Sequence, residues 1–286
     1  MNMPISKPNR VVPKVALSAS MGLAAYWSYL YFSQTRHIFS PAYKALSEEA
    51  AGAAQSVNAA SEFTELRLQV APGVVLEGWA RMPAGLCSAG SRLPCAIYFG
   101  GRSEDVRWLL NEAHGFKDLP MVFFNHRGYG KSQGTPEEKH LIADAHAIYK
   151  WVAQQPWCSR EKISVIGRSL GTGVAMQLAA SAPIHKLVLF TPYDSLLNIA
   201  RRKVPLAPVS LLLRSKFKSH EWAAQVHNPT FVLLAEDDPV VPHDSSLRLI
   251  QHFAVKPLVA TVKGTNHVSL PHDVDAQGLV SHFLLS

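Results

Sequence analysis

Short runs of apolar, β-branched and aromatic residues recur along the chain from residue 61 onward and predict eight β-strands. The later runs are continuously apolar, as expected for strands buried on both faces of a sheet. Helical patterns separate the runs, and this alternation predicts a mainly parallel, doubly wound α/β sheet. The predicted strands are Phe63–Val70, Val74–Ala80, Cys95–Phe99, Met121–Phe124, Ile163–Ile166, Leu187–Phe190, Phe231–Leu234 and Leu258–Val262.

The clearest helical pattern begins at Thr135-Pro136-Glu137-Glu138. This tetrapeptide has the form of a capping box with proline at the first helical position, so it predicts a helix start. The apolar residues that follow share one face at helical spacing. They are Leu141, Ala145, Ile148, Tyr149 and Val152.

Near the N-terminus, Val15–Phe32 forms 18 residues without a charge, flanked by basic residues and closed by four tyrosine and tryptophan residues. This pattern predicts a single-pass membrane anchor, with a cleaved signal peptide and a helix packed on the domain as alternatives. Three basic residues precede the run, against Arg36 and Lys44 after it. They favour a catalytic domain on the non-cytoplasmic side.

The composition excludes several classes of protein. The 286 residues are 48% hydrophobic, with 17 Gly, 19 Pro and 3 Cys, so the chain is neither disordered, collagen-like nor disulfide-stapled. The net charge is +7. Its surplus lies in residues 1–44 and 195–220, which hold five and six cations and no acid, while the remainder has 17 cations against 21 acids. A mildly acidic body argues against a nucleic-acid surface.

The segment with the strongest chemical signal is Ile163–Ala175, in which a buried strand runs through Gly167-Arg168-Ser169-Leu170-Gly171 into a helix of small residues. The glycines allow a tight strand-to-helix turn that lifts the Ser169 hydroxyl above the sheet. Free N–H groups at the helix start can also stabilise an oxyanion. The alternative is a glycine-rich turn in which Ser169 only caps the helix.

Four further motifs accompany this turn, each after a different predicted strand. Phe99-Gly100-Gly101-Arg102 follows the third strand, and Asn125-His126-Arg127-Gly128-Tyr129-Gly130-Lys131-Ser132-Gln133-Gly134 follows the fourth. Asp238-Pro-Val-Val241-Pro242 and Gly264-Thr-Asn-His267 follow the last two. Together they resemble the α/β-hydrolase superfamily over roughly residues 63–285. Within it, the chain is most similar to membrane-anchored serine hydrolases with a short cap, such as monoacylglycerol-type lipases, depalmitoylases and prolyl-oligopeptidase-like peptidases.

A serine nucleophile needs a base and an acid that orients the base, in the chain order Ser, acid, His in this fold. Among the acids after Ser169, only the 236–238 cluster directly follows a buried strand. Within this cluster the resemblance favours Asp238, whose spacing to Val241-Pro242 fits the family, and Asp237 is the runner-up. The other acids after Ser169 are Asp194, Glu221, Glu236, Asp244, Asp273 and Asp275. His267, after the last strand and a glycine turn, is the predicted base, with His243 and His272 as alternates.

The backbone N–H groups of Leu170 and Arg102 are the predicted oxyanion hole. Gly101 and Tyr193 are the predicted substrate-binding residues. Two positions depart from the family: Gly100 stands where many members have His, and Asn125 where Asp is common. No metal or organic cofactor is implied.

The stretch from Tyr193 to Gln225 is the predicted cap. Its cations alternate with apolar residues, which fits either a solvated face or a surface that leans on anionic lipid. The predicted domains are 1–40, a basic segment and anchor or signal; 41–60, a linker; and 61–286, a hydrolase domain with a cap at about 193–225. Cys95 is predicted to be buried, and a pair with Cys87 stays open.

The predicted function is cleavage of an acyl ester or thioester, small or lipid-linked, through an acyl-enzyme, with the membrane as a partner through the N-terminal segment. Two alternatives remain: a serine peptidase of the prolyl-oligopeptidase type, and a non-catalytic binding protein with the same fold. The oligomeric state is left open.

Overall fold

The computed structural model describes residues 11–40, 62–83, 92–116 and 118–286. Within this part of the chain, eight strands form one sheet in the order β1-β2-β4-β3-β5-β6-β7-β8. Strand β2 is antiparallel to β1 and β4, and all other pairs are parallel. The strands are β1 (Phe63–Ala71), β2 (Val74–Arg81), β3 (Leu93–Phe99), β4 (Met121–Phe124), β5 (Cys158–Arg168), β6 (Leu187–Phe190), β7 (Thr230–Asp237) and β8 (Leu258–Asn266).

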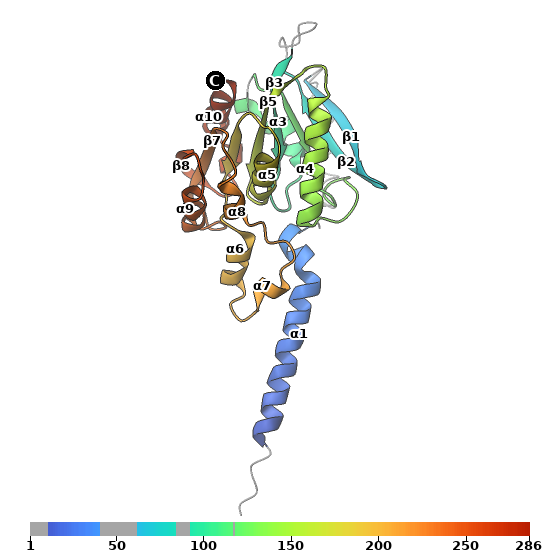
Figure 1. Ribbon diagram of the computed structural model, residues 1–286, viewed down its shortest axis with the longest axis vertical. Coiled ribbons are helices and arrows are strands. Elements are labelled where there is room, and N and C mark those ends of the chain that lie inside the picture. The colour runs from blue at the N-terminus through green and yellow to red at the C-terminus, as the bar shows by residue number, and fades with distance from the viewer. Residues whose placement is uncertain (1–10, 41–61, 84–91, 117) are drawn as a thin grey trace, which may run out of the picture.

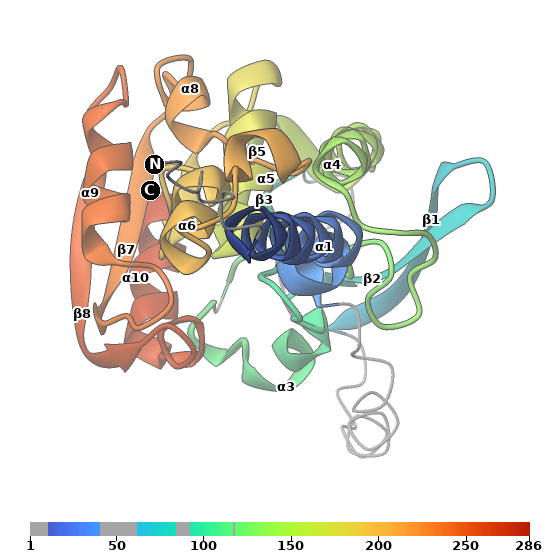
Figure 2. The ribbon, with the colours of Figure 1, turned by 90° about the horizontal axis from the view of Figure 1, so that it is seen from below.

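Helices cover both faces of the sheet (Figures 1 and 2). The α-helices are α1 (Val11–Phe39), α3 (Leu109–Glu112), α4 (Glu138–Ala153), α5 (Leu170–Ser181), α6 (Leu196–Lys203), α7 (Val209–Leu212), α8 (Ser219–Ala223), α9 (His243–Gln251) and α10 (Val274–Leu285). The 3₁₀ turns are η1 (Val106–Trp108), η2 (His114–Phe116) and η3 (Leu270–His272).

The side chains of β3 alternate between two hydrophobic clusters, one on each face of the sheet. Cys95, Ile97 and Phe99 join the cluster that contains residues of α4 and α5, whereas Ala96 and Tyr98 join the one that contains residues of α3 and α10. Burial on both faces explains the continuous apolar runs. The predicted doubly wound, mostly parallel sheet is therefore confirmed, and each predicted strand is present, with β5 starting earlier than expected, at Cys158.

The start of α4 differs from the prediction. The helix begins at Glu138 after the N-cap residue Glu137, whose side chain makes no capping bond, so the predicted capping box at Thr135 is wrong. The hydroxyl of Ser215, far along the chain, accepts a hydrogen bond of 3.1 Å from the Glu138 N–H instead. A tertiary contact has replaced the local cap. The predicted apolar face of this helix is buried as expected.

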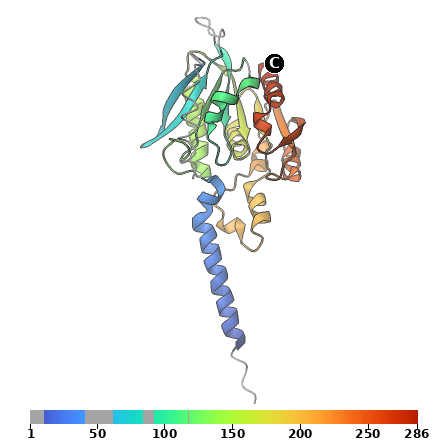
Figure 3. The same ribbon diagram turned by 180° about the vertical axis from the view of Figure 1, so that it is seen from behind.

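The N-terminal apolar run lies in α1, which projects from the domain (Figures 1 and 3). Among the described residues no helix combines the length and the apolar character that a membrane crossing requires. Serine, tyrosine and tryptophan residues interrupt the run Val15–Phe32. Trp27 within this run and Gln34 just after it donate hydrogen bonds to backbone oxygens of the segment between β6 and β7. The predicted single-pass anchor is therefore wrong, and the predicted non-cytoplasmic side of the catalytic domain, which was derived from that anchor, loses its basis. The predicted linker 41–60 lies outside the described residues.

Cys95 is buried, as predicted. Its Sγ lies 2.9 Å from the Sγ of Cys158 on the adjacent strand β5, and both are free thiols. Cys87, the alternative partner, lies outside the described residues.

Candidate active site

Ser169 occupies the junction of β5 and α5 with φ 47° and ψ −115°. A serine in this strained region needs close packing to hold it there. The flanking glycines permit that packing, because a Cβ on Gly171 would lie 2.2 Å from the carbonyl oxygen of Phe99. One on Gly167 would lie 2.7 Å from the Gly171 oxygen. The turn therefore presents the serine hydroxyl at the carboxyl edge of the sheet.

The structure brings together the three residues of the predicted triad from three separate loops. The Nε2 of His267 lies 2.9 Å from the Oγ of Ser169, and its Nδ1 lies 2.8 Å from the Oδ2 of Asp238. Ser169 and His267 are 9% and 7% exposed. The arrangement can pass a proton from the hydroxyl to the imidazole while the carboxylate orients the ring.

Asp238 is held as a charged acceptor. Burial alone would raise its pKa, but hydrogen bonds from His267 and from the N–H groups of Val241 and Val240 lower it below the ordinary value. The runner-up Asp237 is exposed at the end of β7. Among the described acids, Asp238 alone contacts His267.

The alternate histidines point elsewhere. The Nε2 of His243 lies 2.7 Å from the carbonyl oxygen of Ala235, and the Nδ1 of His272 lies 2.6 Å from a carboxylate oxygen of Glu112. Neither ring is bonded to Ser169.

The predicted oxyanion residues lie beside the serine. Leu170 begins α5, and Arg102 follows Gly101, on which a Cβ would lie 3.4 Å from the Ser169 Cβ. The Nε2 of His126 lies 2.9 Å from the Gly100 oxygen, and burial lowers the pKa of this imidazole, so it is neutral and donates. His126 thus supports the loop that lacks the family's usual histidine.

Asn125 stands where the family commonly has aspartate, and its side-chain amide makes three hydrogen bonds. Its Oδ1 accepts a 3.0 Å hydrogen bond from the Val106 N–H, and its Nδ2 donates to Glu77 and Asp105. The amide therefore ties the oxyanion loop to β2.

A buried network behind the oxyanion loop was not predicted. The Glu104 carboxylate accepts hydrogen bonds from Tyr98, Trp108, the Gly101 N–H and Arg168. Burial would raise its pKa, but the Arg168 guanidinium and these donors lower it. Arg168, which directly precedes Ser169, thereby links the turn of the candidate nucleophile to the oxyanion loop. The only signal in the sequence was an acid three residues after a glycine pair.

A cavity of about 520 Å³ opens at Ser169 and His267. Gly101 and Tyr193, the predicted substrate residues, line it, and the Tyr193 hydroxyl donates to the Leu170 oxygen at 3.2 Å. Most of the remaining wall is hydrocarbon from the segment between β6 and β7 and from α1. Cavities of this size and character bind small apolar ligands. Its described lining contains no Asp or Glu.

In the described part of the chain, no group of three or more His, Cys, Asp or Glu side chains is arranged to hold a metal ion.

Comparison with known proteins decides the family. Residues 112–196 match the X-Pro dipeptidyl-peptidase (S15) family. The fold superposes on the crystal structure of 2,6-dihydroxy-pseudo-oxynicotine hydrolase with a TM-score of 0.66, covering 84% of this chain and 72% of that one at 16% identity. The chain belongs to the α/β-hydrolase superfamily.

Two sequence relatives extend the comparison. The uncharacterized protein MT2364 of Mycobacterium tuberculosis is 33% identical over 257 residues, which cover 90% of this α/β-hydrolase and 87% of that protein. The lysophosphatidylserine lipase ABHD12 of Danio rerio is 27% identical over 221 residues, covering 64% of this chain and 56% of that lipase. The protein is therefore a hydrolase.

Proposed function

We propose that this hydrolase cleaves a carboxylic ester or thioester of an apolar acyl group through an acyl-enzyme on Ser169. The observation that carries the proposal is the Ser169–His267–Asp238 relay at the head of a hydrocarbon-lined cavity. A hydroxyl within 2.9 Å of an oriented imidazole is an activated nucleophile.

In the first half-reaction the Ser169 oxygen attacks the acyl carbonyl while His267 takes the hydroxyl proton. The resulting oxyanion accepts hydrogen bonds from the N–H groups of Leu170 and Arg102, and the intermediate then collapses as His267 protonates the leaving alcohol or thiol. In the second half-reaction water attacks the acyl-serine with His267 as base, and the acid is released. Asp238 stays ionised and stabilises the imidazolium in both halves.

The cavity favours an acyl ester over the peptide substrate that the S15 match suggests. An enzyme that removes residues from a free N-terminus needs an acidic group for the terminal ammonium, since a buried charge must be paired. The described lining supplies no carboxylate and consists mainly of aliphatic side chains. The similarity to a lysophosphatidylserine lipase is consistent with an acyl substrate.

A fluorophosphonate reagent tests the nucleophile, because an activated serine oxygen displaces its fluoride. We expect labelling of the wild type and of Ser181→Ala, a control whose hydroxyl is bonded to the α5 backbone, and none of Ser169→Ala. Absence of labelling in the folded wild type would favour the non-catalytic binding protein.

Matched substrates then separate esterase from peptidase. We expect turnover of p-nitrophenyl acyl esters and little of aminoacyl p-nitroanilides, with both activities lost in Ser169→Ala. Preferred cleavage of the anilides would contradict the ester assignment.

A further inference from the structure

Helix α1 forms part of the cavity wall although it precedes the sheet in the chain. Leu30, Gln34, His37 and Ile38 line the cavity. They stand at positions i, i+4, i+7 and i+8, which lie on one face of a helix. Other positions on α1 face away, as Phe32 does at 80% exposure.

Gln34 fixes α1 to the cap. Its Nε2 donates to the Leu212 oxygen at 3.1 Å, and its Oε1 accepts from the Arg214 N–H at 2.8 Å. The side chain is buried, and both the oxygen and the nitrogen of its amide bond to the backbone at the end of α7. The Trp27 indole also donates to the Leu206 oxygen at 3.2 Å. These bonds hold the helix at a set distance from the cap.

The C-terminal end of α1 belongs to the core of the domain. Phe39 is 1% exposed, and its ring lies 6.4 Å from that of Phe217 in an edge-to-face arrangement. The Tyr129 hydroxyl donates to the Phe39 oxygen. The helix therefore leaves the domain from a fixed point.

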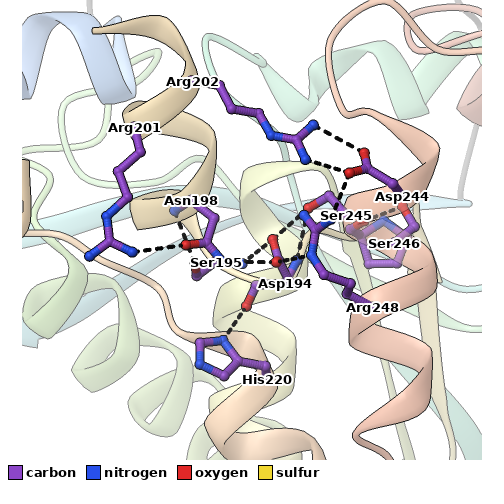
Figure 4. Close-up of polar contacts among 11 residues, drawn as sticks. Asp194, Ser195, Asn198, Arg201, Arg202, His220, Asp244, Ser245, Ser246 and Arg248 are labelled. Atoms are coloured by element: carbon purple, nitrogen blue, oxygen red, sulfur yellow. Dashed lines mark hydrogen bonds and ion pairs between the residues drawn. The ribbon is translucent and has the colours of Figure 1, made fainter. Parts of the chain in front are cut away.

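The facing wall, α6, is fixed by a polar network (Figure 4). Buried Asp194 accepts hydrogen bonds from Ser245 and Arg248 of α9 and from Asn198 of α6. Arg202 of α6 also pairs with Asp244 of α9. Because α9 packs on the sheet, α6 is tied to the body of the domain, and the gap between α6 and α1 has a defined width.

Leu30 lies at the outer end of the lining on α1. Leu30 is eight positions before Ile38, or about 12 Å along the helix at 1.5 Å per residue. Leu30 is half-buried and lines the cavity farther from the domain core than Ile38, which directly precedes the buried Phe39.

We propose that α1 is a specificity-determining wall of the acyl site, and that Leu30 determines how long an acyl chain is enclosed between α1 and the cap. This proposal rests on the ester hydrolysis proposed above.

The test compares Leu30→Trp with Leu23→Trp, the same substitution at a 39% exposed position of α1 that does not line the cavity. We expect Leu30→Trp to lower the ratio of kcat/KM for p-nitrophenyl dodecanoate over butyrate by at least about tenfold, because its ring fills the outer end of the cavity. Leu23→Trp should keep the wild-type ratio. An unchanged ratio in Leu30→Trp, or an equal fall in both variants, would overturn the proposal.

A variant with a smaller side chain at position 30 controls for a folding defect in Leu30→Trp. Leu30→Ser introduces no clash and should also lower the ratio, since it removes apolar contact with the longer chain only. An unchanged ratio in this variant contradicts the role of Leu30.

Ligand binding separates the two proposals. In a Ser169→Ala background, dodecanoate should bind about tenfold more weakly when Leu30→Trp is added, and with unchanged affinity when Leu23→Trp is added. If the wild type hydrolyses no ester but Leu30→Trp still weakens dodecanoate binding, the proposed ester hydrolysis is contradicted and the role of α1 in the acyl site is supported. If the wild type hydrolyses esters but Leu30→Trp leaves the affinity for dodecanoate unchanged, only the role of Leu30 is contradicted.

Discussion

The Arg168 guanidinium donates a 2.8 Å hydrogen bond to the Glu104 carboxylate, and the two side chains are 11% and 4% exposed. This pair joins the turn of the candidate nucleophile to the loop of the candidate oxyanion hole, because Glu104 also accepts from the Gly101 N–H. Arg168 extends the link to the base, donating a longer bond of 3.4 Å to the His267 oxygen.

Glu104→Gln should destabilise the protein by about 3 to 5 kcal/mol, because it leaves a buried guanidinium without its counter-charge. Urea unfolding measures the loss. Glu112→Gln is the matched control, since Glu112 is 53% exposed and its pair with His272 is worth at most about 1 kcal/mol. Similar losses in the free energy of unfolding of the two variants would show that the buried pair stabilises the protein no more than the exposed pair does.

Acid should unfold the protein through its buried carboxylates. Glu104, Asp194 and Asp238 each have a folded-state pKa below the ordinary value, despite burial that alone would raise it, because their hydrogen-bond donors and cations favour the charged form. A lowered pKa contributes stability above the unfolded value of about 4, and that contribution is lost as the pH falls through the folded values. The melting temperature should therefore fall steeply below about pH 4. A smaller decline should precede it between about pH 7 and 5, because burial lowers the pKa of His126 and the unfolded imidazole takes up its proton first. A rise below about pH 4 would refute the charge assignment.

Asp238→Asn should lower kcat on an ester substrate by about 10³- to 10⁴-fold, since an amide cannot hold the tautomer of His267 that accepts the serine proton. Asp237→Asn is its control, because Asp237 is exposed and makes no bond to His267. Steady-state kinetics on the two variants decides between the neighbouring acids. A larger loss in Asp237→Asn would reverse the assignment.

Gly171→Ala should abolish activity and destabilise the fold, because its Cβ would meet the backbone oxygens of Phe99 and Gly100 at 2.2 and 2.5 Å. Gly278→Ala offers the contrast: it lies in α10 with no atom within 4 Å of a new Cβ, so it should stabilise by roughly 0.5 to 1 kcal/mol. Thermal melts and ester kinetics on both variants provide the measurement. Full activity in Gly171→Ala would contradict the packed turn.

Much of the fold follows from local pattern. The eight strands are continuous or alternating apolar runs whose burial on the sheet matches their composition, and the turn at Ser169 is dictated by two glycines that cannot carry a Cβ. Asp238 and His267 could be selected because loops after parallel strands meet at one edge of the sheet.

The features that were missed depend on partners distant in the chain. The cap of α4 comes from Ser215, and Gln34 of α1 bonds to residues near position 212. The lack of charge in Val15–Phe32 suggested a membrane span, but the serine, tyrosine and tryptophan residues within it leave the helix too weakly apolar for a crossing, so this run was misassigned. Glu104 and Arg168 look like surface charges until the fold buries them together.

The most direct test of the central claim is to trap the acyl-enzyme. After acid quench of a reaction with p-nitrophenyl butyrate, mass spectrometry of the digested wild type should find a butyryl group on the peptide that contains Ser169. The same peptide in Ser169→Ala should be unmodified, with turnover lost. A butyryl group on another residue, or undiminished turnover in Ser169→Ala, would contradict the account.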